Sequence, residues 1–351
     1  MDLAAELDQH RSYLVGVAYR MLGSVHAAED VVQEAYVRAE RARQRTLAGR
    51  ADGTAGATPD AADGGDTADG GDTADGGDTA DEPDGLEEIA EPRAWLTRIV
   101  TRLALDELRS ARSRRETYTG PWLPEPLVGP PGTGAPAAGP GAPLTPAASA
   151  PADPSDRVTL DEQVTFALMT VMESLSPAER AVYVLHEAFG IPLNEVAKVV
   201  GRSPAACRQL ASRARRHLAE RSPRFDPDPG DQARVVAAFR RAAETGDVDT
   251  LARLLDDDVR LVADGGGVVT AARRPIEGRE RVINAVLSHT RQAPGATYDP
   301  ITVDGQAGLL AHTGDRMAVL AFVVHDGRIT HIDVVANPEK LDHVAGTFRT
   351  S

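Results

Sequence analysis

Arginine side chains gather on one face of a helix that the sequence predicts from Pro204 to Glu220. Apolar residues recur along this segment at steps of three and four, so the arginines occupy the opposite, solvent-facing side. Guanidinium groups on such a helix can bind DNA phosphates and read base edges in a major groove. The residues expected to make these contacts are Arg202, Ser203, Arg208, Gln209, Arg213, Arg215 and Arg216. A solvated face on an ordinary helical hairpin is the alternative interpretation.

The elements before this helix indicate how it is positioned. Ser176 and Glu179 form a capping-box pattern that starts an earlier helix. A short helix is predicted over Leu193–Val200, and Gly201 makes the turn into the arginine-rich helix. A short helix, a glycine turn and a basic helix are typical of a helix-turn-helix. A further helix over 161–175 leads into this unit.

A second basic helix is predicted from Glu91 to Arg115, with an apolar stripe along one side. Arginines that hold a backbone beside a ring that stacks on bases suit a single nucleic-acid strand, and Trp95 lies near the start of this helix. A Trp95 buried in the core is the competing interpretation. The basic residues expected to contact DNA here are Arg98, Arg102, Arg109 and Arg112.

Two more helices are predicted at the start of the chain, over Leu3–Leu22 and Val25–Leu47, with a Gly-Ser break between them. The apolar stripe of the second helix indicates a buried face. The opposite face is polar, and it is either simply solvated or used to bind a partner. That face carries Asp30, Gln33, Glu34 and Arg38.

The net charge of −15 at pH 7 is misleading for a chain with two basic helices. Residues 51–91 contain ten aspartates and four glutamates but no lysine or arginine, which alone gives −14. Within this segment A-D-G-G-D-T occurs three times in tandem, without any apolar residue larger than alanine. We therefore expect residues 51–85 to be a disordered, acidic insert. Calcium binding by the regular aspartates, and competition with DNA for the basic faces, are weaker hypotheses.

The single cysteine excludes an internal disulfide and fits a reducing compartment. The sequence contains no signal-peptide pattern and no apolar run that could span a bilayer. We therefore expect a cytoplasmic protein without a membrane partner. No metal and no cofactor are expected.

The rest of the chain divides into linkers and an α+β domain. Residues 128–154, rich in proline, alanine and glycine, are expected to be extended and mobile, and 223–230 form a second linker. After two helices, over Gln232–Ala243 and Val248–Leu255, the pattern changes to strands, which predicts a cone of two helices and a curled antiparallel sheet. The predicted strands are Val259–Ala263, Gly267–Ala271, Pro300–Val303, Gly308–His312, Arg316–His325 and Arg328–Ala336, with a helix over Gly278–His289.

The N-terminal part resembles the extracytoplasmic-function group of bacterial RNA polymerase sigma factors. The resemblance rests on D-V-V-Q-E-A-Y-V-R at 30–38, P-R-A-W-L-T-R-I at 92–99, L-D-E-L-R at 105–109 and the helix-turn-helix block 176–220. It implies that the chain gives promoter specificity to core RNA polymerase and directs transcription initiation.

The same resemblance implies a role for each face. The Asp30 face would bind the β′ clamp helices of core polymerase, with further contacts to the β subunit. The helix over 92–115 would open and hold the −10 promoter element, and the Arg208 face would read the −35 element. Arg102 stands where many of these factors carry asparagine, which leaves the base preference at −10 open.

The C-terminal part resembles a SnoaL-like, NTF2-type domain, which a subgroup of these sigma factors carries as an extension. The shared motifs are G-P-W-L-P-E-P at 120–126, D-G-G-G at 264–267 and N-P-E-K-L at 337–341. The resemblance implies that the extension tunes the sigma domains from within the chain. The residues implied in this regulation are Trp122, Leu123, Pro124, Asp264, Gly265, Gly266, Gly267, Asn337 and Pro338. The subgroup's glycine motif usually ends in lysine, whereas Val268 follows here.

Together these patterns predict two all-α sigma domains and an α+β cone. The expected domains are a sigma region 2 domain over 1–118, a proline-rich linker over 119–155, a sigma region 4 domain over 156–222 and a SnoaL-like domain over 231–345.

Two other functions stay open at the level of sequence. One is a helix-turn-helix transcription factor that works without polymerase. The other is a cone that binds a small-molecule ligand or acts as an enzyme, because some NTF2-type domains are enzymes. Catalysis would need convergence of polar groups in one pocket, and no catalytic residue is expected. The candidate polar residues are Asp264, His289, His312, His325, His331 and Asp333.

Overall fold

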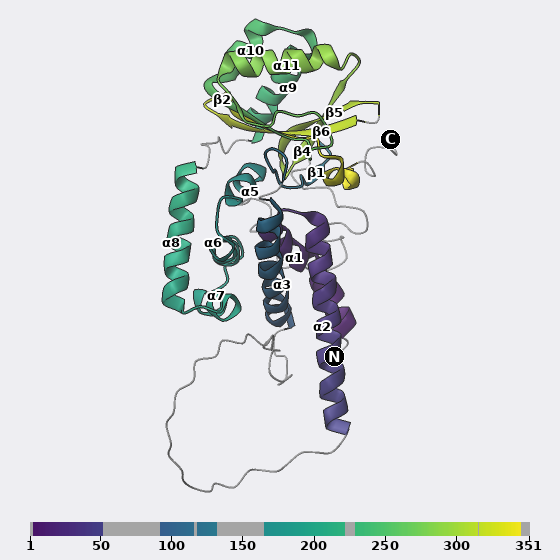
Figure 1. Cartoon of the computed structure of the whole chain (residues 1–351), viewed down its shortest axis with the longest axis vertical. Helices are drawn as coiled ribbons and strands as arrows, with labels where there is room; N and C mark the ends of the chain where they lie inside the picture. The colour runs from purple at the N-terminus through teal and green to yellow at the C-terminus, as the bar shows by residue number, and fades with distance from the viewer. Residues whose placement is uncertain are drawn as a thin grey trace.

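The computed structural model describes residues 3–51, 92–115, 118–131, 165–221, 229–314 and 316–344. Figure 1 shows a group of helices below and a sheet covered by helices at the opposite end of the molecule. The acidic repeats of the predicted insert and the linker after residue 131 lie outside the described residues. Within the described ranges, each helix is too short or too polar to cross a bilayer.

Three helices form what we call the first helical module: α1 (Leu3–Leu22), α2 (Val25–Ala51) and α3 (Pro92–Arg115). These confirm the predicted helices, and α2 continues beyond its predicted end at Leu47. All three helices pack against one another. The turn between α1 and α2 needs Gly23, whose φ of 69° lies in the left-handed region.

The second helical module is the predicted helix-turn-helix with its lead-in helix. It contains α5 (Phe166–Met172), α6 (Pro177–Tyr183), the π-helical η1 (Val184–Ala188), α7 (Leu193–Val200) and α8 (Pro204–Arg221). The capping box is confirmed, because Ser176 Oγ accepts from the Glu179 amide at 3.3 Å and Glu179 Oε2 accepts from the Ser176 amide at 3.1 Å. Gly201 ends α7 with a φ of 67°, which makes the turn into α8.

One apolar core joins the two helical modules. Met21 of α1, Leu96 of α3 and Leu185 of η1 are buried in the same cluster. The helix α3 lies directly against α6 and α7. Because side chains from both modules fill the shared space, separating the modules would expose apolar surface to water.

The C-terminal domain is the predicted cone, with helices on one face of a sheet (Figure 1). The helices on that face are α9 (Pro229–Thr245), α10 (Val248–Leu254) and α11 (Arg279–Gln292), and the 3-10 helix η2 (Pro338–Lys340) follows the last strand. Its strands are β2 (Leu255–Asp264), β3 (Ile276–Glu277), β4 (Thr297–Val303), β5 (Gln306–Thr313), β6 (Arg316–His325) and β7 (Arg328–Val335). The described strands form one sheet in the order β1-β4-β5-β6-β7-β2-β3, where β1 (Val128–Gly129) comes from the linker.

Two predictions about this sheet were wrong. Residues 267–271 form no strand, because positive φ angles of 65° at Gly266 and 74° at Gly267 turn the chain away from the sheet. The strand β3 pairs with β2 instead. The strand β2 also runs parallel to β7, so the sheet is mixed. A parallel pair needs a long connection, and α11 with the four strands β3, β4, β5 and β6 supplies it.

The sheet is apolar on both faces. Its inner face carries Leu261, Phe322 and Ile332, which pack with α9, α10 and α11 in one cluster. Its outer face carries Val262 and Ala321 in a second cluster. The members of this cluster are Leu123, Val128, Phe166, Val262, Ile301, Val303, Leu310, Val319, Ala321, Val335, Leu341 and Val344. Phe166 and Leu123 come from outside the cone, so the helical modules and the linker cover the outer face.

Candidate functional site

Residues 118–131, which we call the strap, connect the first helical module to the cone. A mobile linker was predicted from residue 128. This prediction was wrong for the first residues of the linker, because Val128 and Gly129 pair with Val303 and Thr302 of β4. An extended segment beside an edge strand can satisfy its backbone groups there, which fixes it more firmly than its composition suggests. Leu123 is 1% exposed and packs in the apolar cluster on the outer face of the sheet.

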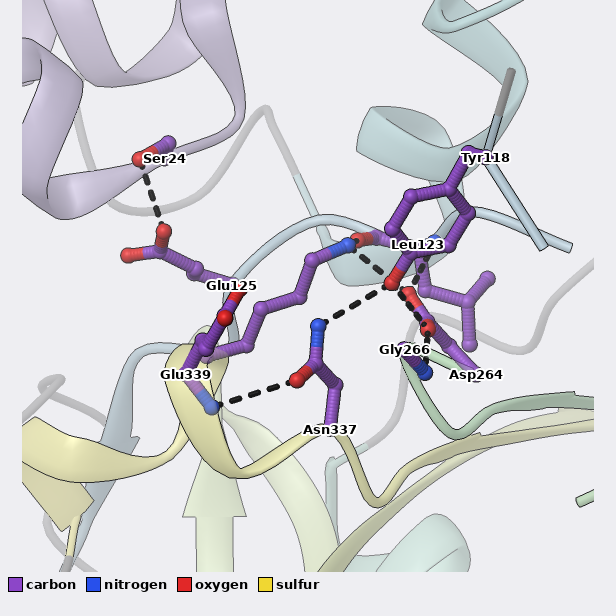
Figure 2. A network of polar contacts seen from close by, with 9 residues as sticks. Ser24, Tyr118, Leu123, Glu125, Asp264, Gly266, Asn337 and Glu339 are labelled. Carbon is purple, nitrogen blue, oxygen red and sulfur yellow. Dashed lines mark hydrogen bonds and ion pairs between the residues drawn. The ribbon is translucent and has the colours of Figure 1, made fainter. Parts of the chain in front are cut away.

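A buried carboxylate, Asp264 at the end of β2, organises the contact between strap and cone (Figure 2). Its Oδ1 accepts from the Tyr118 hydroxyl at 2.6 Å and from the Gly266 amide at 3.0 Å. Its Oδ2 accepts from the Leu123 amide at 2.9 Å and from Lys340 Nζ at 2.7 Å. Burial raises the pKa of Tyr118, so the hydroxyl remains a proton donor to this carboxylate.

The glycines of the D-G-G-G motif allow this close approach. A Cβ at Gly265 would lie 2.3 Å from the Val269 carbonyl oxygen, and one at Gly266 would lie 2.5 Å from Asn337 Cγ. Gly267 packs against Thr119, with 3.2 Å from its Cβ position to Thr119 Cβ. The loop therefore fits against strap and cone only without side chains.

Asn337 and its neighbours complete the network from the C-terminal side. Asn337 Nδ2 donates to the Tyr118 hydroxyl at 3.0 Å, and its Oδ1 accepts from the Glu339 amide at 3.1 Å (Figure 2). Pro338 starts η2 and is exposed, so it shapes the turn and does not touch the strap through a buried side chain. Lys340 Nζ also donates to the Leu123 carbonyl oxygen.

The Trp122 ring packs over Lys340 and contacts the first helical module. The ring centre lies 3.8 Å from Lys340 Nζ, a cation–π distance. The same ring lies 3.1 Å from the Cβ position of Gly23. Pro124 is buried next to it. The predicted regulatory residues Trp122, Leu123, Asp264 and Asn337 therefore meet in one place.

Glu125 of the strap caps the N-terminus of α2. Its carboxylate accepts from the Val25 amide and from Ser24 Oγ, both at 2.7 Å. Its own amide donates to the Gly23 carbonyl oxygen at 2.9 Å, and its carbonyl oxygen accepts from the Tyr19 hydroxyl at 2.7 Å. A carboxylate at this end of a helix is stabilised by the free amides and by the helix dipole.

Arg180 of α6 joins the second helical module to the end of α1. Its side chain is 2% exposed, its Nη1 pairs with Glu173, and its Nε donates to the Arg20 carbonyl oxygen at 3.2 Å. A cation at the C-terminal end of a helix is favourable for the same reason as an anion at the other end. The turn at Gly23 is thus held by Arg180 on one side and Glu125 on the other.

The predicted DNA-reading helix presents only part of its arginine face freely. Arg213 Nε and Arg215 Nη1 each lie 3.2 Å from a glutamate oxygen, of Glu179 and Glu187 respectively. These two arginines therefore also brace α8 against the preceding helices. The other predicted residues, all exposed, are Arg202, Ser203, Arg208, Gln209 and Arg216.

The predicted −10 residues lie along α3. Arg98 and Arg102 are exposed, and Arg109 pairs with Asp106 at 2.9 Å. The side chain of Arg112 lies outside the described residues. Trp95 is half-buried and packs against the helical core, which favours the structural interpretation of this ring.

The predicted polymerase-binding face lies along α2. Asp30 and Gln33 are exposed, and Glu34 accepts from Arg38 Nε at 2.8 Å within the helix. Val37 lies between them and is 38% exposed, so the face combines charge with an apolar side chain. Such a mixture is typical of a protein-binding surface.

The polar residues weighed for catalysis lie in different surroundings. Asp264 belongs to the strap contact, and the half-buried His312 pairs with Asp299 at 2.8 Å. A small cavity beside α5 is lined by Asp333 but by none of the histidines. Asp264, His312 and Asp333 therefore lie in three separate places, whereas an acid–base pair needs groups that converge in one pocket.

Comparisons with known proteins identify the modules. A family model described as sigma-70 region 2 matches residues 7–52, and one described as sigma-70, region 4 matches residues 165–218. The extracytoplasmic-function sigma factor SigJ of Mycobacterium tuberculosis is 37% identical over 349 residues, which cover 96% of this chain and 92% of that protein. The chain belongs to the extracytoplasmic-function RNA polymerase sigma factors.

The similarity of this sigma factor to its relatives includes the cone. A probable sigma factor of the same group, SigI of Mycobacterium tuberculosis, is 35% identical and covers 95% of this chain and 92% of that protein. The crystal structure of SigJ matches with a TM-score of 0.65 at 31% identity, and covers 97% of this chain and 98% of that chain. The predicted fold class, two sigma domains with an NTF2-like C-terminal domain, is confirmed.

Several residues that hold this sigma factor together were not singled out from the sequence. They are Tyr19, Tyr118, Glu125, Arg180, Asp304 and Lys340. Glu125 and Lys340 lie within the quoted motifs, so the motif itself was the available signal. No sequence signal indicated that Arg180 is buried, because a buried arginine on a helix has the same local sequence pattern as a solvated one.

Proposed function

We propose that this sigma factor has two arrangements, the closed form of Figure 1 and an open form that initiates transcription with core RNA polymerase. The observation that supports the closed form as inactive is the shared core of the two helical modules, with Arg180 buried against the end of α1. In that arrangement the two expected promoter-binding surfaces belong to one compact unit.

Distances along DNA argue that this unit cannot serve both promoter elements. The names of the −10 and −35 elements give their positions on the promoter, so the two elements lie about 25 base pairs apart. At about 3.4 Å per base pair this separation is about 85 Å. Packed helices lie only about 8–10 Å apart, and α6 and α7 separate α3 from α8. Two layers of helices therefore place α3 and α8 only about 20 Å apart. The modules must separate to reach both elements at once.

In the open form each surface takes the role that the family resemblance implies. The face of α2 binds the β′ clamp helices, the face of α3 opens the −10 element, and α8 reads the −35 element, with the second module also touching the β subunit. The domains are 1–118, 119–155, 156–222 and 231–345, with the strap as the ordered start of the linker. The protein acts in the cytoplasm, where polymerase and promoter DNA are.

The cone regulates these steps and does not catalyse a reaction. Its outer face binds the strap and α5, so it stabilises the closed form through contacts with both helical modules. The interior is filled by side chains such as Phe239 and Phe322, whose rings lie 5.2 Å apart. A ligand of the cone would act by favouring one arrangement of the domains.

Run-off transcription with core polymerase and a matching promoter tests this proposal. The full-length chain is compared with Lys340→Met, which leaves Asp264 without its cation, and with Arg234→Ala, which removes an exposed ion pair on α9. We expect a higher transcript yield from Lys340→Met and an unchanged yield from Arg234→Ala. Absence of any transcript with every variant would contradict the assignment of the function itself.

A further inference from the structure

Three carboxylates are buried where the cone meets the other parts of the chain. Asp264, Asp304 and Asp333 are 0%, 9% and 5% exposed. Asp264 has Lys340 as its counter-ion. In the part of the chain that the structure describes, neither Asp304 nor Asp333 forms an ion pair. A buried carboxylate without a cation is costly, and protonation relieves that cost.

Asp304 lies between the cone and the first helical module. It follows β4 with a φ of 47°, and its amide donates to the Leu127 carbonyl oxygen of the strap at 2.8 Å. Its carboxylate receives only long hydrogen bonds, from the Tyr19 hydroxyl at 3.3 Å and the Leu127 amide at 3.4 Å. The titratable groups that face it are Tyr19 and Arg20 of α1. Burial raises the pKa of Asp304 to about 7, and Arg20 acts in the opposite direction.

Asp333 lies between the cone and the second helical module. It is paired with Val262 and Ala321 on the neighbouring strands, and both belong to the outer apolar cluster that Phe166 of α5 covers. The described residues of α5 carry no titratable group, so the nearby charged or titratable groups are Arg260 and His331 on the sheet. Burial raises the pKa of Asp333 to about 7, against a lowering effect of Arg260.

Asp333 lines a small cavity. It has a volume of about 30 Å³ and lies between α5, α9 and the outer face, with Thr165, Phe166 and Gln232 in its lining. A water molecule needs roughly 10–15 Å³ of such space, so about two waters fit but no metabolite does. The proton is therefore the ligand that suits this part of the interface.

We propose that Asp304 and Asp333 make the domain arrangement sensitive to pH, so that protonation of both holds the cone against the helical modules and ionisation opens the molecule. The inference rests on the proposed function, because it concerns the closed and open forms defined there. One carboxyl faces each helical module, so ionisation weakens both contacts of the cone.

The direction and size of the effect follow from linkage. In the closed form both carboxyls have a pKa of about 7, whereas exposure in the open form returns them to the ordinary range near 4. The closed form therefore binds more protons and is favoured as the pH falls through 7. Between pH 8 and pH 6 each group changes the closing equilibrium by about tenfold, and both together by about 100-fold.

The affinity for core polymerase reports this equilibrium, because a partner that binds only the open form binds in proportion to its population. We would titrate core polymerase with the full-length chain at pH 6, 7 and 8, and with Asp304→Asn, Asp333→Asn and the double variant. Asparagine keeps the shape of a protonated aspartate but cannot ionise. Asp299→Asn is the matched control, because Asp299 lies on β4 and its side chain is 56% exposed.

We expect the affinity of the unmodified chain for polymerase to rise about 100-fold from pH 6 to pH 8, and the affinity of the double variant to stay constant and lower over this range. Each single variant should keep only about a tenfold rise between pH 6 and pH 8, and Asp299→Asn should behave like the unmodified chain. The same pH dependence in the unmodified chain and the double variant would overturn the inference. So would tighter binding at low pH, which is the direction expected if histidine charging in the interface opened the molecule. Absence of polymerase binding at every pH would instead refute the proposed function.

Discussion

Lys340 and Asp264 form a buried ion pair, with Nζ 2.7 Å from Oδ2 and the two side chains 8% and 0% exposed. The pair lies entirely within the cone, yet both of its members also bind the strap through Leu123. The charge that stabilises the cone therefore also fixes the segment that leads out of the first helical module.

Removing the cation should destabilise this contact strongly. Lys340→Met leaves the Asp264 carboxylate buried and unpaired, and we expect a loss of about 3–5 kcal/mol in the unfolding free energy of the cone. The double variant Asp264→Asn/Lys340→Met removes both charges and should lose less. Thermal unfolding followed by calorimetry measures both. If the single change costs no more than the double change, the charge pairing is not what holds this site.

The close approach of the glycine loop can be separated from its backbone strain. Gly266→Ala introduces a left-handed alanine and a Cβ at 2.5 Å from Asn337 Cγ, whereas Gly327→Ala introduces a left-handed alanine with nothing within 4 Å. We expect about 1–2 kcal/mol of destabilisation at Gly327 and a further 1–3 kcal/mol at Gly266. Equal losses in urea unfolding would show that the loop has room for a side chain.

The cap on α2 should be visible in local dynamics. Glu125→Ala removes the acceptor of the Val25 amide and of Ser24 Oγ, which should cost about 0.5–2 kcal/mol. Hydrogen exchange of the Val25 amide should then become several-fold faster. Glu280→Ala, an exposed change at the start of α11, should leave this amide unchanged. Unchanged exchange in Glu125→Ala would mean that other groups cap the helix.

Two arginines on α8 should differ in their effect on promoter recognition. Arg208 is exposed, and Arg208→Ala should weaken binding of the holoenzyme to the −35 element by about 1–3 kcal/mol and relax its sequence preference. Arg213 pairs with Glu179, so Arg213→Ala should affect DNA affinity less and alter sequence preference little. Binding to promoters with single −35 changes distinguishes the two. The reverse order of effects would contradict the assigned reading face.

Charge reversal on α2 should weaken polymerase binding while the fold survives. Asp30→Lys combined with Glu34→Lys places cations on a face whose side chains are solvated in the closed form. We expect at least about a tenfold loss of affinity for core polymerase, because like charges placed in an interface cost several kcal/mol. Circular dichroism checks the helices. An unchanged affinity with an intact helix content would move the binding surface elsewhere.

Local patterns in the sequence predicted most of the helices and strands. The capping box at Ser176 and the turn at Gly201 were each correct, because these signals act over a few residues. The motif residues Asp264 and Asn337 were also assigned to one interface, although only through a family resemblance. Their partner Tyr118 was missed, because nothing in its neighbourhood along the chain indicates burial.

Long-range relationships could not be predicted in the same way. The parallel pairing of β2 with β7 depends on the whole path of the chain between them. The sequence of α6 alone does not indicate that Arg180 is buried, because this burial depends on how one helical module packs against the other. The docking of Val128 on β4 was masked by a composition that is typical of mobile linkers.

Separation of the two helical modules in the initiating complex is the central claim, and a distance between them tests it most directly. Fluorophores at Gln9 of α1 and Asn194 of α7, both exposed, report that distance by energy transfer, and the buried Cys207 stays unlabelled. We expect high transfer in the free chain and low transfer once core polymerase and promoter DNA are bound. High transfer in a complex that is actively making transcript would contradict the account.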